Sequence, residues 1–206
     1  MAQYKAPLRD MRFVLNEVFD AGTFWQNNAA LNHVDVDTVN AILEEMAKVS
    51  ENVLLPINRS GDEEGCSISN GVVTTPTGFK EAFKQYAEAG WIGLGADEQF
   101  GGQGMPKMVT VMTDEMIFAA NPSFTLYPLL SIGAAMSMAQ HASPEINAVY
   151  LPKMYSGEWA GTMCLTEPHS GTDLGIIRTK AEPLADGSYA ISGTKIFITG
   201  GEHDLT

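Results

Sequence analysis

One short segment, residues 163–173, combines residue types that could bind an anion. It reads Met163-Cys-Leu-Thr-Glu-Pro-His-Ser-Gly-Thr-Asp173. Its first residues are expected to end a strand, and backbone N–H groups beyond a strand end are free to donate to a ligand. Gly171 leaves room for an anion close to the backbone, and Thr172 adds a hydroxyl donor beside it. The segment is a candidate phosphate or pyrophosphate loop, but the residues alone favour an ordinary glycine turn between strands.

The remaining sequence offers no comparable motif. The 4 histidines lie far apart and no Cys-x-x-Cys pair occurs, so a metal site is not expected. The stretch from Gly93 to Glu98 lacks the last glycine of a dinucleotide fingerprint, and neither a P-loop nor a nucleophile elbow occurs. The two cysteines, Cys66 and Cys164, do not make a disulfide framework.

Composition excludes two further classes of protein. The 206 residues include 12 Lys and Arg against 25 Asp and Glu, and because no basic stripe occurs, nucleic acid is not an expected partner. Residues 116–144 carry no Asp, Glu, Lys or Arg, but Pro122 and Pro128 interrupt them, and no apolar run approaches the roughly 18–20 residues of a membrane span. The N-terminus has no apolar signal segment. The sequence therefore predicts a soluble, cytoplasmic protein.

Hydrophobic spacing predicts the elements that must position the candidate loop. Apolar residues at helical spacing predict helices over residues 8–22, 35–56, 79–90, 108–120, 126–141 and from 144. A turn signal at Asn70-Gly71 predicts a small hairpin over residues 67–73. Beyond Gly157 the pattern predicts strands over residues 159–166, 176–181 and 189–199. Helices followed by strands indicate the α+β class. Because three strands would leave open edges, we expect the chain to be the front part of a longer protein.

Two motifs resemble signatures of the acyl-CoA dehydrogenase family. Cys164-Leu-Thr-Glu-Pro-His-Ser-Gly-Thr-Asp173 is similar to the family's flavin-loop signature, with Ile176 where a small residue is usual. Gly193-Thr-Lys-Ile-Phe-Ile-Thr-Gly-Gly201 resembles the second signature, with Phe197 in place of the usual Trp. This exchange keeps an aromatic ring and loses an indole N–H.

Upstream motifs resemble the same family and occur in the same order. Glu98-Gln-Phe-Gly-Gly-Gln-Gly104 is similar to the family's Gly-Gly loop. Leu151-Pro-Lys-Met-Tyr-Ser-Gly-Glu158 is similar to the lead-in to its β domain. Residues 4–13 resemble the N-terminal extension of a larger bacterial subgroup that includes 3-methylmercaptopropionyl-CoA dehydrogenase-like proteins. The resemblance implies a division into an extension over residues 1–33, an all-helical domain over 34–158, and the start of an antiparallel β-barrel-like middle domain over 159–206.

By resemblance, two segments of the chain hold FAD. The cofactor-binding residues that it implies are Met163, Cys164, Leu165, Thr166, Gly171, Thr172, Phe197, Ile198 and Thr199. Leu165 and Thr166 would bind the pyrimidine edge of the flavin, and the Thr199 hydroxyl would lie near its N5 atom. Thr172 would reach the pyrophosphate and also the acyl-CoA substrate.

The resemblance places no catalytic residue in this chain. The family's reaction needs a carboxylate base, which the resemblance puts in a C-terminal helical domain beyond residue 206. Glu167 is therefore expected to hold the corner of the loop and not to act as the base. Glu98 is expected to be a loop carboxylate, and His169 a solvated histidine.

The activity implied is FAD-dependent α,β-dehydrogenation of an acyl-CoA thioester to a 2-enoyl-CoA. Electrons would pass to an electron-transferring flavoprotein, and the protein would form a homodimer or homotetramer. Three alternatives stay open: an acyl-CoA oxidase of the same fold, a flavin-bearing nucleic-acid-binding relative with an alkylation-response role, and an inactive fragment that has the fold alone.

Overall fold

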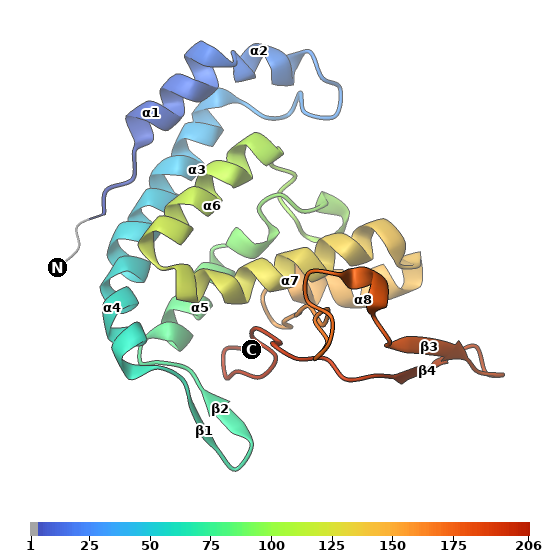
Figure 1. Ribbon diagram of the computed structural model, residues 1–206. Helices are drawn as coiled ribbons and strands as arrows, with labels where there is room; N and C mark the ends of the chain where they lie inside the picture. The colour runs from blue at the N-terminus through green and yellow to red at the C-terminus, as the bar shows by residue number, and fades with distance from the viewer. Residues whose placement is uncertain (1–3) are drawn as a thin grey trace.

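The computed structural model describes residues 4–206, so the first three residues of the expected N-terminal extension lie outside the described residues. Two regions are distinguished here: a helical body that ends at Tyr155, and an arm formed by residues 160–200 (Figure 1). The helical elements are α1 (Leu8–Phe13), η1 (Val14–Val18), α2 (Ala21–Gln26), α3 (Val36–Val49), η2 (Ser50–Leu54), α4 (Leu55–Glu64), α5 (Phe79–Glu88), η3 (Trp91–Gly93), η4 (Glu98–Phe100), α6 (Lys107–Ala120), α7 (Pro122–His141), α8 (Pro144–Tyr155) and η5 (Leu174–Ile176). The strands are β1 (Ser67–Ser69), β2 (Val72–Thr74), β3 (Lys180–Pro183) and β4 (Tyr189–Ser192).

The helix expected over residues 8–22 is instead divided into α1, the π-helical turn η1, and α2. The break falls at Asp20, whose φ of 44° lies in the left-handed region. Aspartate tolerates this conformation better than most residues, because its short polar side chain can bond locally. The prediction of one continuous helix was wrong at this residue.

One helical run, made of α3, the π-helical turn η2 and α4, forms a long edge of the body (Figure 1). It begins at Asp35, whose carboxylate accepts a hydrogen bond from the Thr38 N–H at 2.8 Å. The sequence predicted an end at Pro56, but the run continues to Glu64. Proline lacks an N–H and crowds the carbonyl four residues earlier. The wider hydrogen-bond spacing of η2 directly before Pro56 lets the helix continue.

The core of the body is built around the ring of Phe124, which is fully buried. Its centroid lies 5.8 Å from that of Phe79 and 5.9 Å from that of Tyr86, both edge-on. The ring of Phe83 lies 6.4 Å away. These contacts join α5 to α7 in the geometry that aromatic pairs prefer.

A buried amide sets the start of α7. The Asn121 side chain accepts a hydrogen bond from the Phe124 N–H at 3.0 Å and donates to the Leu54 carbonyl at 3.1 Å. Pro122 follows at the first helical position, which tolerates its missing N–H. The sequence predicted that this helix begins near residue 126, but it begins at Pro122.

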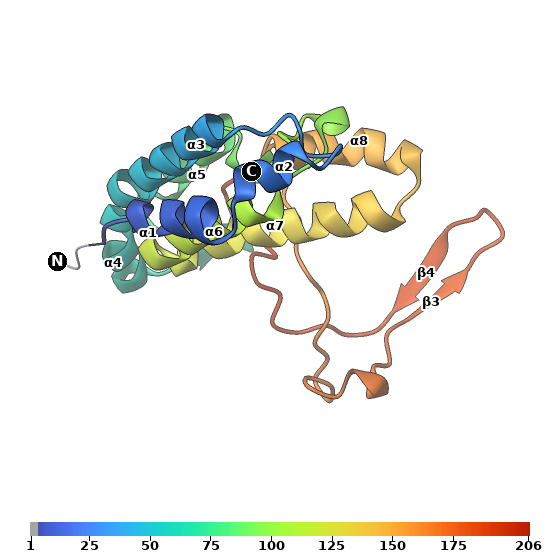
Figure 2. The ribbon, with the colours of Figure 1, turned by 90° about the horizontal axis from the view of Figure 1, so that it is seen from above.

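The strands form two separate antiparallel hairpins in the described part of the chain. The β1–β2 hairpin confirms the prediction at Asn70-Gly71, where both residues have positive φ as a two-residue hairpin turn requires. The β3–β4 hairpin pairs Lys180 with Ser192 and projects from the body at the end of the arm (Figure 2).

The α+β class, with a helical domain first and antiparallel strands after it, is confirmed. Three predicted strand ranges are corrected. The strand expected over residues 176–181 is β3, which begins at Lys180 and ends at Pro183. Residues 159–166 contain no strand, and residues 193–199 do not continue β4. The two stretches share one backbone hydrogen bond, from the Ile196 N–H to the Thr166 carbonyl at 2.9 Å, and one bond is too few for a ladder. Among residues 4–206, no helix combines the length and apolar character needed to cross a bilayer.

Candidate functional site

Two expected cofactor segments lie side by side in the arm. We call residues 163–166 the strand-end segment and residues 197–199 the second-signature segment. The bond from Ile196 to Thr166 joins them at one end. The Thr162 hydroxyl donates to the Thr199 carbonyl at the other. The structure thus brings together seven of the nine residues that the resemblance implied, from positions about thirty residues apart.

Both segments leave apolar surface open. Met163 and Leu165 are exposed, and the ring of Phe197 is 85% exposed. The backbone of Phe197 has a φ of 57°, in the left-handed region that bulky residues rarely adopt. Thr199 is exposed, whereas Thr166 is half-buried. An exposed aromatic ring on a strained backbone offers a flat apolar wall to a ligand.

The glycine loop, defined as residues 167–173, turns tightly between Glu167 and Ser170. Each residue of this pair donates its N–H to the carbonyl of the other, at 2.9 and 3.0 Å. The buried Ser170 hydroxyl donates to the Asp173 carbonyl at 2.6 Å. Gly171 faces open space, since a Cβ placed on it meets no atom within 4 Å. The N–H groups of Gly171 and Thr172 donate to no acceptor among residues 4–206.

The Glu167 carboxylate holds the loop from inside and is 2% exposed. It accepts hydrogen bonds from the N–H groups of Arg178 and Thr179 and from the Lys195 ammonium, each at 2.9 Å. The His169 Nε2 lies 3.4 Å away. Hydrogen bonds from Thr179 and from the Arg178 N–H, together with Lys195, hold the pKa of this carboxyl far below its usual range. A carboxylate with such a low proton affinity is a poor base, which agrees with a role at the corner.

Lys195 is the site residue that sequence reasoning missed. Its ammonium donates to the Leu165 carbonyl at 2.8 Å as well as to Glu167. The side chain is only 19% exposed. A usable signal was present, because Lys195 is the one charged residue between Tyr189 and Thr199.

The chain is anchored to the body directly after the second-signature segment. Asp204 accepts hydrogen bonds from the Thr75 N–H at 3.0 Å and from the Thr75 hydroxyl at 2.7 Å. The His203 ring packs edge-on against Tyr127, with centroids 5.3 Å apart, and Leu205 joins the hydrophobic core. Burial lowers the pKa of the His203 imidazole. No local pattern could reveal contacts between residues 129 positions apart.

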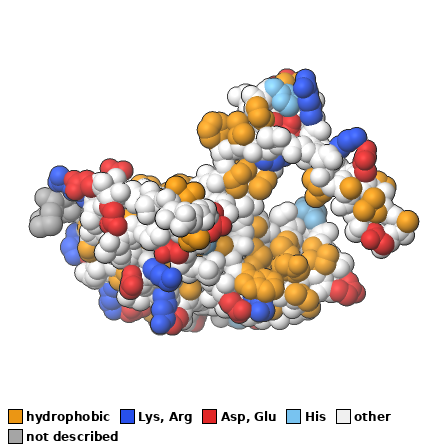
Figure 3. All heavy atoms as spheres, turned by 90° about the horizontal axis from the view of Figure 1, so that it is seen from below, with side chains coloured by type: hydrophobic (Ala, Val, Ile, Leu, Met, Phe, Trp, Pro, Cys, Tyr) orange, Lys and Arg blue, Asp and Glu red, His pale blue; other side chains and the backbone are white. Residues whose placement is uncertain are grey.

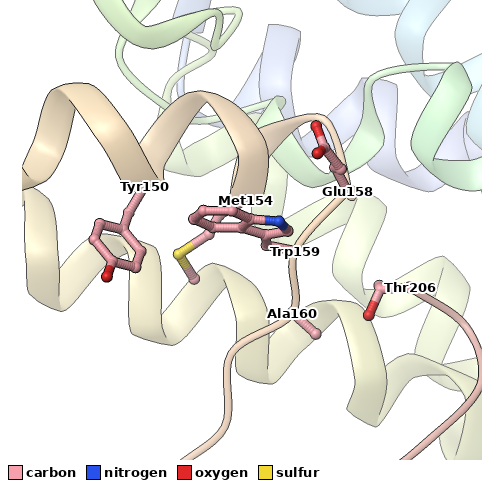
Figure 4. Close-up of a pocket in the computed structure, with 6 residues that line it drawn as sticks. All are labelled: Tyr150, Met154, Glu158, Trp159, Ala160 and Thr206. Carbon is pink, nitrogen blue, oxygen red and sulfur yellow. The ribbon is translucent and has the colours of Figure 1, made fainter.

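The two other predicted residues, Gly171 and Thr172, lie in the glycine loop, which directly follows the strand-end segment. Within residues 4–206, no hydrogen bond joins Gly171 or Thr172 to the second-signature segment. Two hollows occur nearby, but neither is lined by the nine expected residues. One, of about 560 Å³, is lined by Tyr150, Met154, Glu158, Trp159, Ala160 and Thr206 (Figure 4). The other, of about 220 Å³, is lined by Ala160, Gly161, Thr162, Gly200, Gly201, Glu202, His203 and Thr206, at the base of the two segments.

Hydrophobic side chains gather on one face of the body and along the arm (Figure 3). Large apolar residues that are exposed on α7, on α8 and just after it are Leu126, Met136, Ile146, Val149, Tyr150 and Trp159.

The residues from 4 to 206 include no group of three or more His, Cys, Asp or Glu side chains placed to hold a metal ion.

Comparison with known proteins identifies the class. Residues 37–158 match the acyl-CoA dehydrogenase N-terminal domain. The chain is 41% identical over 206 residues to 3-methylmercaptopropionyl-CoA dehydrogenase of Ruegeria pomeroyi, covering 98% of the chain and 34% of the relative. This chain belongs to the acyl-CoA dehydrogenase family. The family and the subgroup expected from the motifs are both confirmed.

Further similarities support the same class. The chain is 37% identical over 206 residues to butyryl-CoA dehydrogenase of Syntrophomonas wolfei, covering 98% of the chain and 34% of the relative. The crystal structure of glutaryl-CoA dehydrogenase from Mycobacterium smegmatis matches the fold with a TM-score of 0.68 at 22% identity, over 83% of this chain and 41% of that one. The chain thus spans about one third of the length of the curated relatives it matches.

Proposed function

We propose that this chain supplies the flavin-binding part of an FAD-dependent acyl-CoA dehydrogenase, which converts an acyl-CoA thioester to a 2-enoyl-CoA. The observation that carries the proposal is the arm's geometry. The strand-end and second-signature segments lie side by side, next to a glycine loop whose outward N–H groups are free. Relatives that match nearly the whole chain are named as dehydrogenases of this substrate class.

The residues present fit FAD in charge and shape. The free N–H groups of Gly171 and Thr172 suit an anion such as a pyrophosphate. The exposed ring of Phe197 and the exposed apolar side chain of Leu165 suit a flat aromatic group. The remaining residues of the proposed set are Met163, Cys164, Thr166, Ile198 and Thr199. Bound FAD would supply the hydride acceptor, chemistry that no side chain provides.

The chain's own carboxylates are not proposed as the catalytic base. Glu167 is fully occupied in holding the loop. Glu98 lies on the exposed turn η4, close to His33. We propose that the base comes from outside this chain, and that Thr172 also contacts the acyl-CoA. The proposed roles of the chain's residues are therefore to bind and orient the cofactor.

The division of the chain and its partners belong to the same proposal. We propose an extension over residues 1–33, a helical domain over 34–158 and the beginning of a β domain over 159–206. The match over residues 37–158 supports the middle boundary. The exposed apolar side chains on α7 and α8 (Figure 3) suit coverage in a homodimer or homotetramer. An electron-transferring flavoprotein is the proposed electron acceptor, and a cytoplasmic location stays a prediction.

Gly171→Val in the complete protein tests cofactor binding. A Cβ at this position has no protein atom within 4 Å, so the fold should be kept, while the new bulk stands where an anion must approach the backbone. We expect the content of bound FAD to fall sharply with unchanged helical circular dichroism. Gly133→Val is the matched control, because Gly133 in α7 also has open space around an added Cβ. Equal FAD content in both variants would exclude the glycine loop as the cofactor loop.

Thr199→Val tests the reaction. Valine keeps the branched shape of the side chain and removes only the hydroxyl. Loss of a hydrogen bond to a group that accumulates charge costs about 1.5–3 kcal/mol, which is roughly ten- to hundredfold in rate. We expect retained FAD and slower flavin bleaching by acyl-CoA in rapid mixing. An unchanged bleaching rate would leave Thr199 without a role.

A further inference from the structure

One side chain, that of Lys195, links the strand-end segment to the glycine loop. Lys195 precedes the second-signature segment, and its ammonium donates to the Leu165 carbonyl in the strand-end segment at 2.8 Å. The same ammonium donates to the Glu167 carboxylate in the glycine loop at 2.9 Å. Lys195, two residues before the second-signature segment, therefore contacts both the strand-end segment and the glycine loop.

This contact is well shielded from water. The Lys195 side chain is 19% exposed and Glu167 is 2% exposed. The other groups around the carboxylate are the N–H groups of Arg178 and Thr179 and the His169 ring. Ion pairs that are shielded and share further hydrogen bonds hold their geometry better than exposed pairs do. The other lysine of the arm differs, since the Lys180 side chain is 63% exposed and forms an ion pair with its near neighbour Glu182.

We propose that Lys195 is a positioning residue, which sets the separation of the strand-end segment, the glycine loop and the second-signature segment so that one FAD molecule contacts all three. The inference rests on the proposed function, because it concerns the spacing of the same cofactor site. Few other contacts could fix the separation of these three parts of the site. The direct bonds between the two segments are those from Ile196 to Thr166 and from Thr162 to Thr199, and neither reaches the glycine loop.

Three variants of the complete protein test the proposal by titration with FAD. Lys195→Met removes the ammonium and keeps an apolar side chain, and we expect the FAD dissociation constant to rise about ten- to hundredfold, the effect of losing a hydrogen bond to a charged group. The visible absorption band of the remaining bound FAD should also change shape. Lys180→Met is the matched control and should bind FAD as the unsubstituted protein does.

The double variant Glu167→Gln/Lys195→Met separates positioning from charge neutralisation. It removes the unpaired buried charge that Lys195→Met alone leaves behind, so amide exchange at Arg178 and Thr179 should be slower than in Lys195→Met. FAD affinity should stay low, because the link to the Leu165 carbonyl is still absent. Recovery of FAD affinity in the double variant, or normal affinity in Lys195→Met, would overturn the proposal. Failure of the unsubstituted protein to bind FAD would instead overturn the proposed function and this inference with it.

Discussion

The helical body and the arm are held together by different forces. In the body, a large cluster of hydrophobic residues around Phe124 is buried. In residues 160–200, the buried residues are Glu167 and Ser170, and both are polar. Every residue of β3 and β4 is exposed. The body thus derives its stability from hydrophobic burial, whereas the arm depends on a few hydrogen bonds that converge on one loop.

This difference separates folding from function within one chain. Removing apolar area from the body lowers the stability of the whole fold. Removing a hydrogen bond from the arm changes the local geometry of the proposed cofactor site and leaves the helices intact. The candidate site is therefore the part of the molecule in which small polar changes should have the most specific effects.

The largest expected effect follows from Phe124→Ala in the body. The ring is fully buried and contacts three other aromatic rings. Truncating a buried Phe costs about 3–5 kcal/mol of unfolding free energy. We expect a large drop in the urea midpoint measured by helical circular dichroism. A change in unfolding free energy below about 1 kcal/mol would mean that the body's core lies elsewhere.

A smaller and local effect is expected from Ser170→Ala in the arm. The substitution removes the bond to the Asp173 carbonyl, worth about 0.5–1.5 kcal/mol. Amide exchange in the glycine loop should accelerate, while the unfolding midpoint of the helices stays unchanged. Ser192→Ala, at an exposed position in β4, is the control and should change neither quantity. A lowered helical midpoint in Ser170→Ala would show that the arm and the body unfold as one unit.

Acid should loosen the anchor between arm and body through His203. Burial lowers the pKa of this imidazole in the folded state below the ordinary value of 6.5. Between the two pKa values the unfolded state binds more protons, so stability falls as the pH drops through this window. The protection of the Leu205 amide, which is its exchange rate relative to the intrinsic rate at the same pH, should therefore fall below about pH 6.5. His203→Phe keeps an aromatic ring against Tyr127 and should remove this pH dependence, and persistence of the dependence would assign it to another group.

The smallest effect is expected on the surface of the body. Arg59 and Glu63 form an ion pair at 2.8 Å on α4, with both side chains largely exposed. Such a pair contributes only about 0.3–0.5 kcal/mol and is screened by salt. Arg59→Ala should leave the urea midpoint almost unchanged at high salt. A loss comparable to that of Phe124→Ala would contradict the view that hydrophobic burial stabilises the body.

Much of the body could be predicted because its signals are local. Helical spacing, the Asp35 cap and the Asn70-Gly71 turn each act over a few residues, and the corresponding elements are present. The errors fell where geometry overrode a local rule. Pro56 continues a helix because a π-helical turn precedes it, and Asp20 breaks one by adopting a left-handed conformation.

The arm could be predicted less well because its contacts are distant in sequence. The pairing of Glu167 with Lys195 spans 28 positions, and that of Thr75 with Asp204 spans 129. No periodicity encodes such contacts. The motifs indicated the candidate site, but the contacts of Lys195 became visible only in the three-dimensional structure.

Amide hydrogen exchange of the complete protein, with and without FAD, tests the central claim most directly. The claim is that the glycine loop and the strand-end and second-signature segments together hold the cofactor. FAD should slow exchange in residues 163–173 and 196–199 and leave the β1–β2 hairpin unchanged. Slowing confined to other residues, or none in either range when FAD is bound, would contradict the claim.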